Sequence, residues 1–241
     1  GEIALRAMRS RILVEKKKNE NVLSLNEQRL DNQDLASLAH YEKLDGVVSL
    51  SLRNNHFDYL GVQELANSPY LKNLTSLNLM SNKIGDKGLL ILAESPNLSQ
   101  LENLNLENTG ITSLGILALS QSPHLNKLKE LNLNSNELGG KGFRILADSG
   151  NFNNLVKLRT SGASMGDAEL HAIVQSNTLN QLEDLEAMGN VITRESLDSL
   201  ADSSKLSQLK KLDLRRNKLK DVDLIFLADS PRFQSLEVLR F

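Results

Sequence analysis

The chain has 241 residues, a formal net charge of -2, 4% aromatic residues and no cysteine. The charge argues against general nucleic-acid binding, because domains of that kind usually carry a basic excess. The lack of cysteine excludes disulfides and thiolate zinc sites and is typical of a reducing cytosol. The sequence shows neither an apolar run of about 18 residues nor a secretory signal, so we expect a cytoplasmic protein without a membrane partner.

Residues 1–19 place Leu5, Met8 and Ile12 at helical spacing, with arginines between them and Lys16 to Lys18 after them. This pattern predicts a basic amphipathic helix. One interpretation is a helix that binds an acidic surface or a membrane. The favoured interpretation is a capping helix that covers the apolar end of the repeats behind it. Because the chain begins with Gly1 and not with Met, we expect that a segment has been removed before it.

Residues 20–241 repeat with a period of 27 residues and no insertion. The period is clearest in one leucine column: Leu23, Leu50, Leu77, Leu104, Leu131, Leu158, Leu185, Leu212 and Leu239. A fixed period of this size indicates a solenoid, in which each unit buries its apolar face only against its neighbours. We expect one elongated domain of eight full units and a ninth strand, with no linker.

The first part of each unit alternates as a short strand does. Around Leu77 and Leu79 the alternation predicts one buried face, and it places Ser76, Asn78 and Met80 on an open face. An asparagine follows in most units, at Asn55, Asn82, Asn136, Asn190 and Asn217. Since a carboxamide can both donate and accept, this column predicts a ladder of hydrogen bonds to the backbone of adjacent coils.

The second part of each unit has apolar residues at i, i+3 and i+4, as at Leu89, Leu92 and Ala93, which predicts a helix with one buried stripe. Asp31, Asp58, Thr112 and Thr193 share the column before the helix and suit N-caps, and Gly85, Gly139 and Gly166 take that place in other units. A serine column follows each helix. All four prolines come directly after it, where they act as helix stop signals.

The L-x-x-L-x-L-x-x-N pattern followed by a helix resembles the leucine-rich repeat, and the 27-residue form resembles its ribonuclease-inhibitor-like subclass. The resemblance implies an α/β fold: a right-handed solenoid shaped as a curved arc, with a parallel sheet on the concave face and helices on the convex face. Spacing gives the curvature independently, because parallel strands stack about 4.8 Å apart whereas helices need roughly 8–10 Å.

The concave face changes from small neutral residues to charged ones at the fifth and sixth units. The predicted partner-binding patch consists of Lys157, Arg159, Asp184, Glu186, Met188, Lys211, Asp213, Arg215 and Arg240. Arginine and methionine are enriched at protein interfaces, and the arginine excess favours an acidic partner. The alternative is a surface without a ligand, because charges of opposite sign on adjacent strands stabilise a sheet by themselves.

The sixth and seventh units also break the repeat consensus. Thr160 and Ala187 replace core leucines, and Ala163 replaces the ladder asparagine. Smaller side chains predict a void or a local inward shift of the strands beneath the charged residues. The favoured alternative is sequence drift, with compensation by neighbouring side chains.

No constellation in the sequence supports catalysis, a cofactor or a metal. The four histidines, His40, His56, His124 and His171, fall in different repeat columns. Phosphate-loop and nucleophile-elbow motifs are absent. Asp86 and Asp167 invite a calcium interpretation, but the oxygen-rich loop that such a site requires is missing.

The last residues, including Leu236, Leu239 and Phe241, begin a strand and leave it without a cap. We expect the natural chain to continue, or a partner or second copy to cover this edge in an end-to-end contact. The predicted function is a non-catalytic scaffold that binds a protein on its concave face. Two alternatives stay open: the recognition arm of a larger multidomain enzyme or of a bacterial effector acting in the host cytosol, and an inhibitor of a target enzyme.

Overall fold

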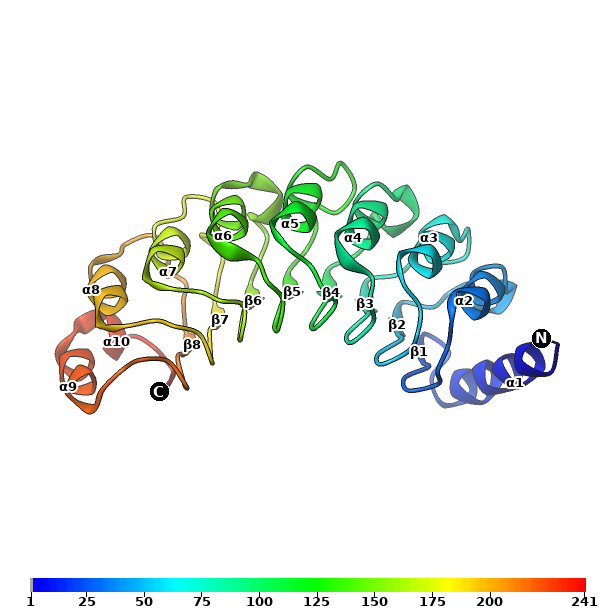
Figure 1. The fold of residues 1–241 in the computed structure, drawn as a ribbon, viewed down its shortest axis with the longest axis horizontal. Helices are drawn as coiled ribbons and strands as arrows, with labels where there is room; N and C mark the ends of the chain where they lie inside the picture. Colours follow the sequence, from blue (N-terminus) through cyan, green and yellow to red (C-terminus); the bar gives the residue numbers. More distant parts are fainter. Residues whose placement is uncertain (1) are drawn as a thin grey trace.

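A computed structural model describes residues 2–241, apart from the side chains of residues 2–5, 18, 224, 228 and 232. Strands and helices alternate along this part of the chain, and Figure 1 shows them as an arc with the strands on the inside and the helices on the outside. The strands are β1 Val22–Ser24, β2 Ser49–Ser51, β3 Ser76–Asn78, β4 Asn103–Asn105, β5 Glu130–Asn132, β6 Lys157–Arg159, β7 Asp184–Glu186, β8 Lys211–Asp213 and β9 Val238–Arg240.

The helices are α1 Glu2–Lys18, α2 Asn32–Ala39, α3 Tyr59–Asn67, α4 Gly85–Ala93, α5 Ser113–Ser120, α6 Gly139–Asp148, α7 Asp167–Val174, α8 Arg194–Asp202, α9 Asp221–Asp229 and α10 Pro231–Gln234, with 3-10 turns η1 Glu42–Leu44, η2 Pro96–Leu98 and η3 Gly150–Phe152. Helices α2 to α9 cover the outer side of the sheet, and α1 lies at its N-terminal end (Figure 1). From α2 to α9, each helix contacts the next one along the chain. Because helices are thicker than strands, this stacking curves the sheet toward its inner side.

The nine strands of the described chain form one parallel sheet in sequence order. Leu77 pairs with Leu104 and Leu104 with Leu131, as the constant repeat length requires. Together with the helix stripes and the leucines between coils, this column forms one continuous core in which nearly every leucine is excluded from water. The predicted α/β solenoid with a parallel inner sheet is confirmed.

The asparagine column forms the predicted ladder. Asn82 donates from Nδ2 to the carbonyl oxygens of Leu52 (3.0 Å) and Leu79 (2.9 Å), and its Oδ1 accepts from the backbone N–H of Asn55 at 3.0 Å. Thr109, in the same column, makes one of these side-chain bonds, from Oγ1 to the Leu106 carbonyl. Each asparagine therefore ties the backbone of its own coil to that of the preceding coil, in a place that water does not reach.

The serine column, predicted only to follow each helix, forms a second ladder. The hydroxyl groups of Ser68, Ser95 and Ser203 donate to carbonyl oxygens at the end of the preceding helix, at 2.7, 2.6 and 2.7 Å. Ser122, Ser149 and Ser176 do the same. Helix C-termini leave carbonyls without partners, and these six serines each satisfy one of them.

The helix starts follow the predicted N-caps in part. The side chains of Asp31, Asp58, Thr112 and Thr193 accept backbone N–H groups as predicted. The expectation that Gly85 and Gly139 occupy the same cap position is wrong, because both are the first residues of their helices. Each has φ of +60°, a conformation that glycine adopts without steric cost, and no side chain caps either helix.

Helix α1 lies against the first coil, with Met8 and Ile12 buried in the common core. Several of its basic groups face the protein: the Arg9 guanidinium lies over the Tyr41 ring, and Lys16 Nζ donates to the Lys43 carbonyl at 2.7 Å. These contacts place α1 over the first coil, and its role as a cap stays a prediction. The side chain of Leu5 lies outside the described part, and the boundary at residues 19 and 20 stays a prediction.

The substitution Asn82→Ala tests the asparagine ladder. It removes four hydrogen bonds and leaves buried backbone groups without partners, so we expect a loss of about 2–4 kcal/mol in the free energy of unfolding. Urea denaturation followed by circular dichroism measures it. The matched control is Asn73→Ala, an exposed asparagine for which we expect a change within about 0.5 kcal/mol. Equal effects of the two substitutions would refute the ladder's role.

Candidate binding surface

The concave face of the sheet is called the inner wall here, and three residue columns project from it. The middle column consists of Ser24, Ser51, Asn78, Asn105, Asn132, Arg159, Glu186, Asp213 and Arg240. It is flanked by the column from Val22 to Val238 and by the column from Asn26 to Arg215. The leucines between these residues point into the core. The inner wall is therefore mostly polar, with Val22, Met80, Met188 and Val238 as apolar members, and most of its charges lie from β5 onward.

Four residues of the predicted patch form a closed ion-pair group on β6 and β7. Lys157 Nζ lies 3.1 Å from Asp184 Oδ2 and 3.8 Å from Glu186 Oε1, and Arg159 Nε lies 3.0 Å from the same Glu186 oxygen. The side chains are 19–32% exposed. This arrangement is the cross-strand pairing of opposite charges that was the alternative to a ligand site in the sequence-based prediction. Its four charges are satisfied within the protein.

A second ion-pair group surrounds Asp213 on β8. Arg215 Nη2 lies 2.6 Å from Asp213 Oδ2, and Arg240 Nη1 lies 3.8 Å from the same oxygen. Asp213 is 8% exposed, and partial burial by itself raises the pKa of its carboxyl group. The hydrogen bonds and charge of Arg215, followed by the charge of Arg240, outweigh burial and lower that pKa below its ordinary value. Asp213 therefore stays ionised and holds two arginines on the inner wall.

Glu107 of the inner wall makes no ion pair with a described residue, but it accepts a hydrogen bond from Asn132. Two other charged side chains of the inner wall make neither an ion pair nor a side-chain hydrogen bond with any described residue. They are Glu130 on β5, which lies outside the predicted patch, and Lys211 on β8, which lies in it; both are exposed. Glu130 pairs in register with Lys157, but the Lys157 ammonium turns to the carboxylates of β7. Lys211 pairs in register with Asp184, whose carboxylate Lys157 occupies.

The inner wall is hollowed in two places. One hollow crosses β3 to β6 and is lined by Ser76, Asn78, Asn103, Asn105, Glu130, Asn132, Lys157 and Arg159 together with the leucines beneath them. The other crosses β6 to β9 and is lined by Lys157, Asp184, Glu186, Lys211, Leu212, Asp213, Val238 and Arg240. Lys157 lines both. The closed ion-pair group thus separates a hollow that contains Glu130 from a hollow that contains Lys211.

The floor of the first hollow carries oriented amide groups of asparagines that lie outside the predicted patch. The Oδ1 atoms of Asn78, Asn105 and Asn132 each accept the backbone N–H two residues further on, at 3.0 Å. This contact fixes which end of each carboxamide faces outward. The Asn132 amino group donates to Glu107, whereas those of Asn78 and Asn105 have no acceptor among the described residues. The sequence marks these amide groups by an asparagine at the same middle-column position of three successive repeats.

Met188 is the remaining residue of the predicted patch, and it lies on the inner wall between Ser161 and Arg215 in its column. Its side chain is half-buried, and its backbone N–H donates to Ser161 Oγ at 3.2 Å. The structure thus brings all nine predicted residues to one end of the inner wall. Thr160, Ala163 and Ala187 lie beneath them, fully buried, with the strand register intact. The Thr160 hydroxyl donates to the Glu186 carbonyl, which satisfies its polar group.

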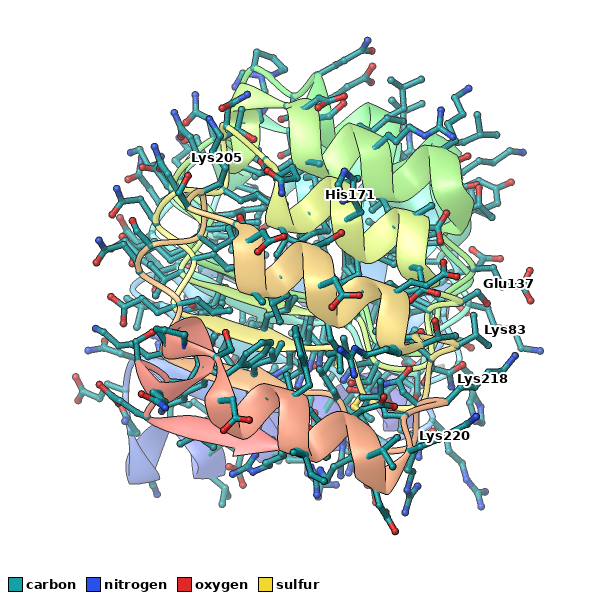
Figure 2. All side chains as sticks on the ribbon, turned by 90° about the vertical axis from the view of Figure 1, so that its left-hand side faces the viewer. Lys83, Glu137, His171, Lys205, Lys218 and Lys220 are labelled. Carbon is teal, nitrogen blue, oxygen red and sulfur yellow. The ribbon has the colours of Figure 1, made fainter. Side chains whose placement is uncertain are left out.

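The other candidate chemistry is dispersed or already occupied. Asp86 accepts hydrogen bonds from Thr112 and Gly115, and Asp167 accepts them from Thr193 and Ser196 of the next coil. Within residues 2–241, no group of three histidines or acidic residues is arranged to hold a metal. Figure 2 shows Lys83, Glu137, Lys218 and Lys220 along one edge of the solenoid, Lys205 at the opposite edge and His171 on the outer side of α7. None of these belongs to the inner wall.

Comparison with known proteins agrees with the fold. The leucine-rich-repeat family matches residues 70–93, 124–144 and 205–228. The matched segments are similar to leucine-rich repeats, and the chain has the leucine-rich-repeat fold. No helix of the described chain has the length and apolar character needed to span a membrane.

Among solved structures, the chain is similar to internalin C2 of Listeria monocytogenes, with 22% identity, a TM-score of 0.61 and coverage of 92% of this chain and 80% of that one. It is also similar to a leucine-rich-repeat protein of Leptospira interrogans, with 19% identity, a TM-score of 0.48 and coverage of 95% of this chain and 57% of that one. No curated protein matches the sequence. The first similarity supports the fold, and at this identity it supports nothing beyond the fold.

The substitution Asp213→Asn tests the ion-pair group on β8 through pH. Because the folded-state pKa of Asp213 is lowered, its ionised form stabilises the fold above the unfolded-state pKa of about 3.9, and this contribution disappears as the pH falls through the folded-state value. At neutral pH we expect the variant to be less stable by about 1 kcal/mol. The difference should shrink below about pH 4.

Urea denaturation at a series of pH values measures this difference. The control is Asp229→Asn, an exposed carboxylate at the end of α9 for which no ion pair is formed with the described residues. A stability difference for Asp213→Asn that stays constant from neutral to acid pH would contradict the assignment.

Proposed function

We propose that this chain is a non-catalytic scaffold that binds a protein partner through the inner wall over β5 to β9. Leucine-rich repeats generally serve as protein–protein interaction modules. The observation that carries the proposal is that buried leucines, asparagines and serines hold the coils together, while Glu130 and Lys211 on the inner wall make no contact between coils. The inner-wall side chains line two hollows, and Lys211 and Glu130 have no partner among the described residues.

The ion pairs refine which patch residues face a partner. Lys157, Arg159, Asp184 and Glu186 are satisfied by one another, and they serve chiefly to shape the wall. Contact then centres on Lys211, Met188 and Arg240, the last held only loosely by Asp213. The nine patch residues include five cations and three anions, so an acidic partner surface remains the favoured complement at this end.

The ribonuclease-inhibitor-like subclass belongs to the same proposal. Its support is a full helix of eight to ten residues in each coil from α2 to α9. Inhibition of an enzyme and target recognition for a larger enzyme or a bacterial effector are two uses of the same surface. The captured partner distinguishes them: an enzyme that loses activity when bound supports the inhibitor, and a cytosolic partner that stays active supports the recognition arm.

The substitution Lys211→Glu tests the proposed surface. Affinity capture from lysates of candidate source and host cells, followed by mass spectrometry, identifies partners of the wild-type chain. Because Lys211 makes no internal ion pair with the described residues, reversal should lower partner recovery about tenfold while leaving the melting temperature nearly unchanged.

The controls for this test are Glu94→Lys and Lys141→Glu, exposed charges on the outer helices α4 and α6. We expect both variants to retain the partner. Equal loss of the partner in the outer-face variants, or full retention in Lys211→Glu and in Met188→Glu, would reject the inner wall as the binding surface.

A further inference from the structure

Two charges of the inner wall, Glu130 and Lys211, have neither an ion pair nor a side-chain hydrogen bond within the described chain, and they have opposite signs and stand in one column. This column runs Glu130, Lys157, Asp184 and Lys211 on four successive strands. Its two middle members pair with each other, so its two ends face solvent as an isolated carboxylate and an isolated ammonium group. Neither end has a hydrogen bond or ion pair from its side chain to any described residue.

The internal competition explains why both ends stay unpaired. The Lys157 ammonium has one carboxylate beside it on β5 and two on β7, and it contacts both of those on β7. The carboxylates near Lys211 are already occupied, Asp184 by Lys157 and Asp213 by two arginines. Each end charge is therefore available to a partner without the loss of an internal contact.

The positions of the two charges set a distance. Glu130 and Lys211 are three strands apart, which corresponds to roughly 14 Å along the arc at about 4.8 Å per strand. An extended peptide rises about 3.4 Å per residue, so the same distance spans roughly four residues. Each charge lies in its own hollow, and Lys157 lies between the two.

The first hollow also favours an extended peptide over other partners. The outward amino groups of Asn78 and Asn105 lie on adjacent strands beyond Glu130 and have no acceptor within the described chain. Main-chain carbonyls of an extended segment are suitable acceptors for them. A peptide that lies along the arc can meet these donors, then Glu130 and then Lys211.

We propose that the inner wall recognises an extended segment of a partner protein that places a basic side chain at Glu130 and an acidic side chain roughly four residues away at Lys211. This inference rests on the proposed function and specifies the chemistry of its partner. The proposed function favours an acidic partner, and this inference adds that one side chain of the bound segment must be basic. A uniformly acidic segment would be repelled by the unpaired carboxylate of Glu130.

The test is selection of random linear peptides displayed on phage against the wild-type chain. We expect the selected peptides to share a basic and an acidic residue about four positions apart. Reselection against Glu130→Gln should remove the basic preference alone, and reselection against Lys211→Met the acidic preference alone. For one selected peptide, each substitution should weaken binding about fivefold by fluorescence anisotropy.

The matched controls are Glu137→Gln and Lys218→Met, exposed charges of the same types on the edge shown in Figure 2. Both should bind the selected peptide as the wild type does. The inference would be overturned by selected peptides that bind the inner wall but lack the paired charges. It would also be overturned if Glu130→Gln and Lys211→Met did not change the charge preference. Either result would leave the proposed function standing. A library without any inner-wall binder would overturn the inference too, whereas the proposed function is decided separately by partner capture with Lys211→Glu.

Discussion

The structure depends on parallel pairing of strands that are separated by a constant number of residues. Because Leu77 must lie beside Leu104, and Leu104 beside Leu131, every coil has to return to the sheet after the same length of chain. A single inserted residue would move one strand by a position and turn its core leucines toward solvent. The uninterrupted period is thus a packing requirement, and it fixes the place of every column on the inner wall.

Hydrogen bonds between adjacent coils stabilise the stack in addition to leucine packing. Three sets of side chains join each coil to its neighbour: the asparagines after the strands, the serines after the helices, and the capping contacts at Asp86 and Asp167. For Asp167, burial raises the carboxyl pKa, and the hydrogen bonds from Ser196 and Thr193 reverse this and lower it. These contacts satisfy the buried polar groups along the turns and helix ends. On the inner wall, Asn134 and Ser161 also accept backbone N–H groups of the following coil, whereas Glu130 and Lys211 make no contact between coils.

The sequence predicts the periodic part of the molecule well for the same reason. Strand register, the buried leucine column, the asparagine ladder and four N-caps follow from the spacing of residue types, and spacing is visible in a sequence. The caps assigned to Gly85 and Gly139 were wrong because a glycine has no side chain that could reveal whether it precedes or begins a helix. The serine ladder was missed because its acceptor is a backbone carbonyl one coil away, which no residue type marks.

The pairing of charges could not be read from the columns alone. Alternating signs at Glu130, Lys157, Asp184 and Lys211 permit two closed pairs, one at each end, or a single pair in the middle. The second column decides between them: Arg159 and Glu186 add a cation to β6 and an anion to β7, so the two central strands form a group of four charges that is satisfied within itself. Because Lys157 and Asp184 already have partners in this group, Glu130 and Lys211 gain little electrostatic energy by turning toward them. Internal stabilisation of the sheet and exposure of two opposite charges on the inner wall are thus consequences of one arrangement. The ion-pair interpretation applies to the central residues of the wall, and partner binding is proposed for the charges at its two ends.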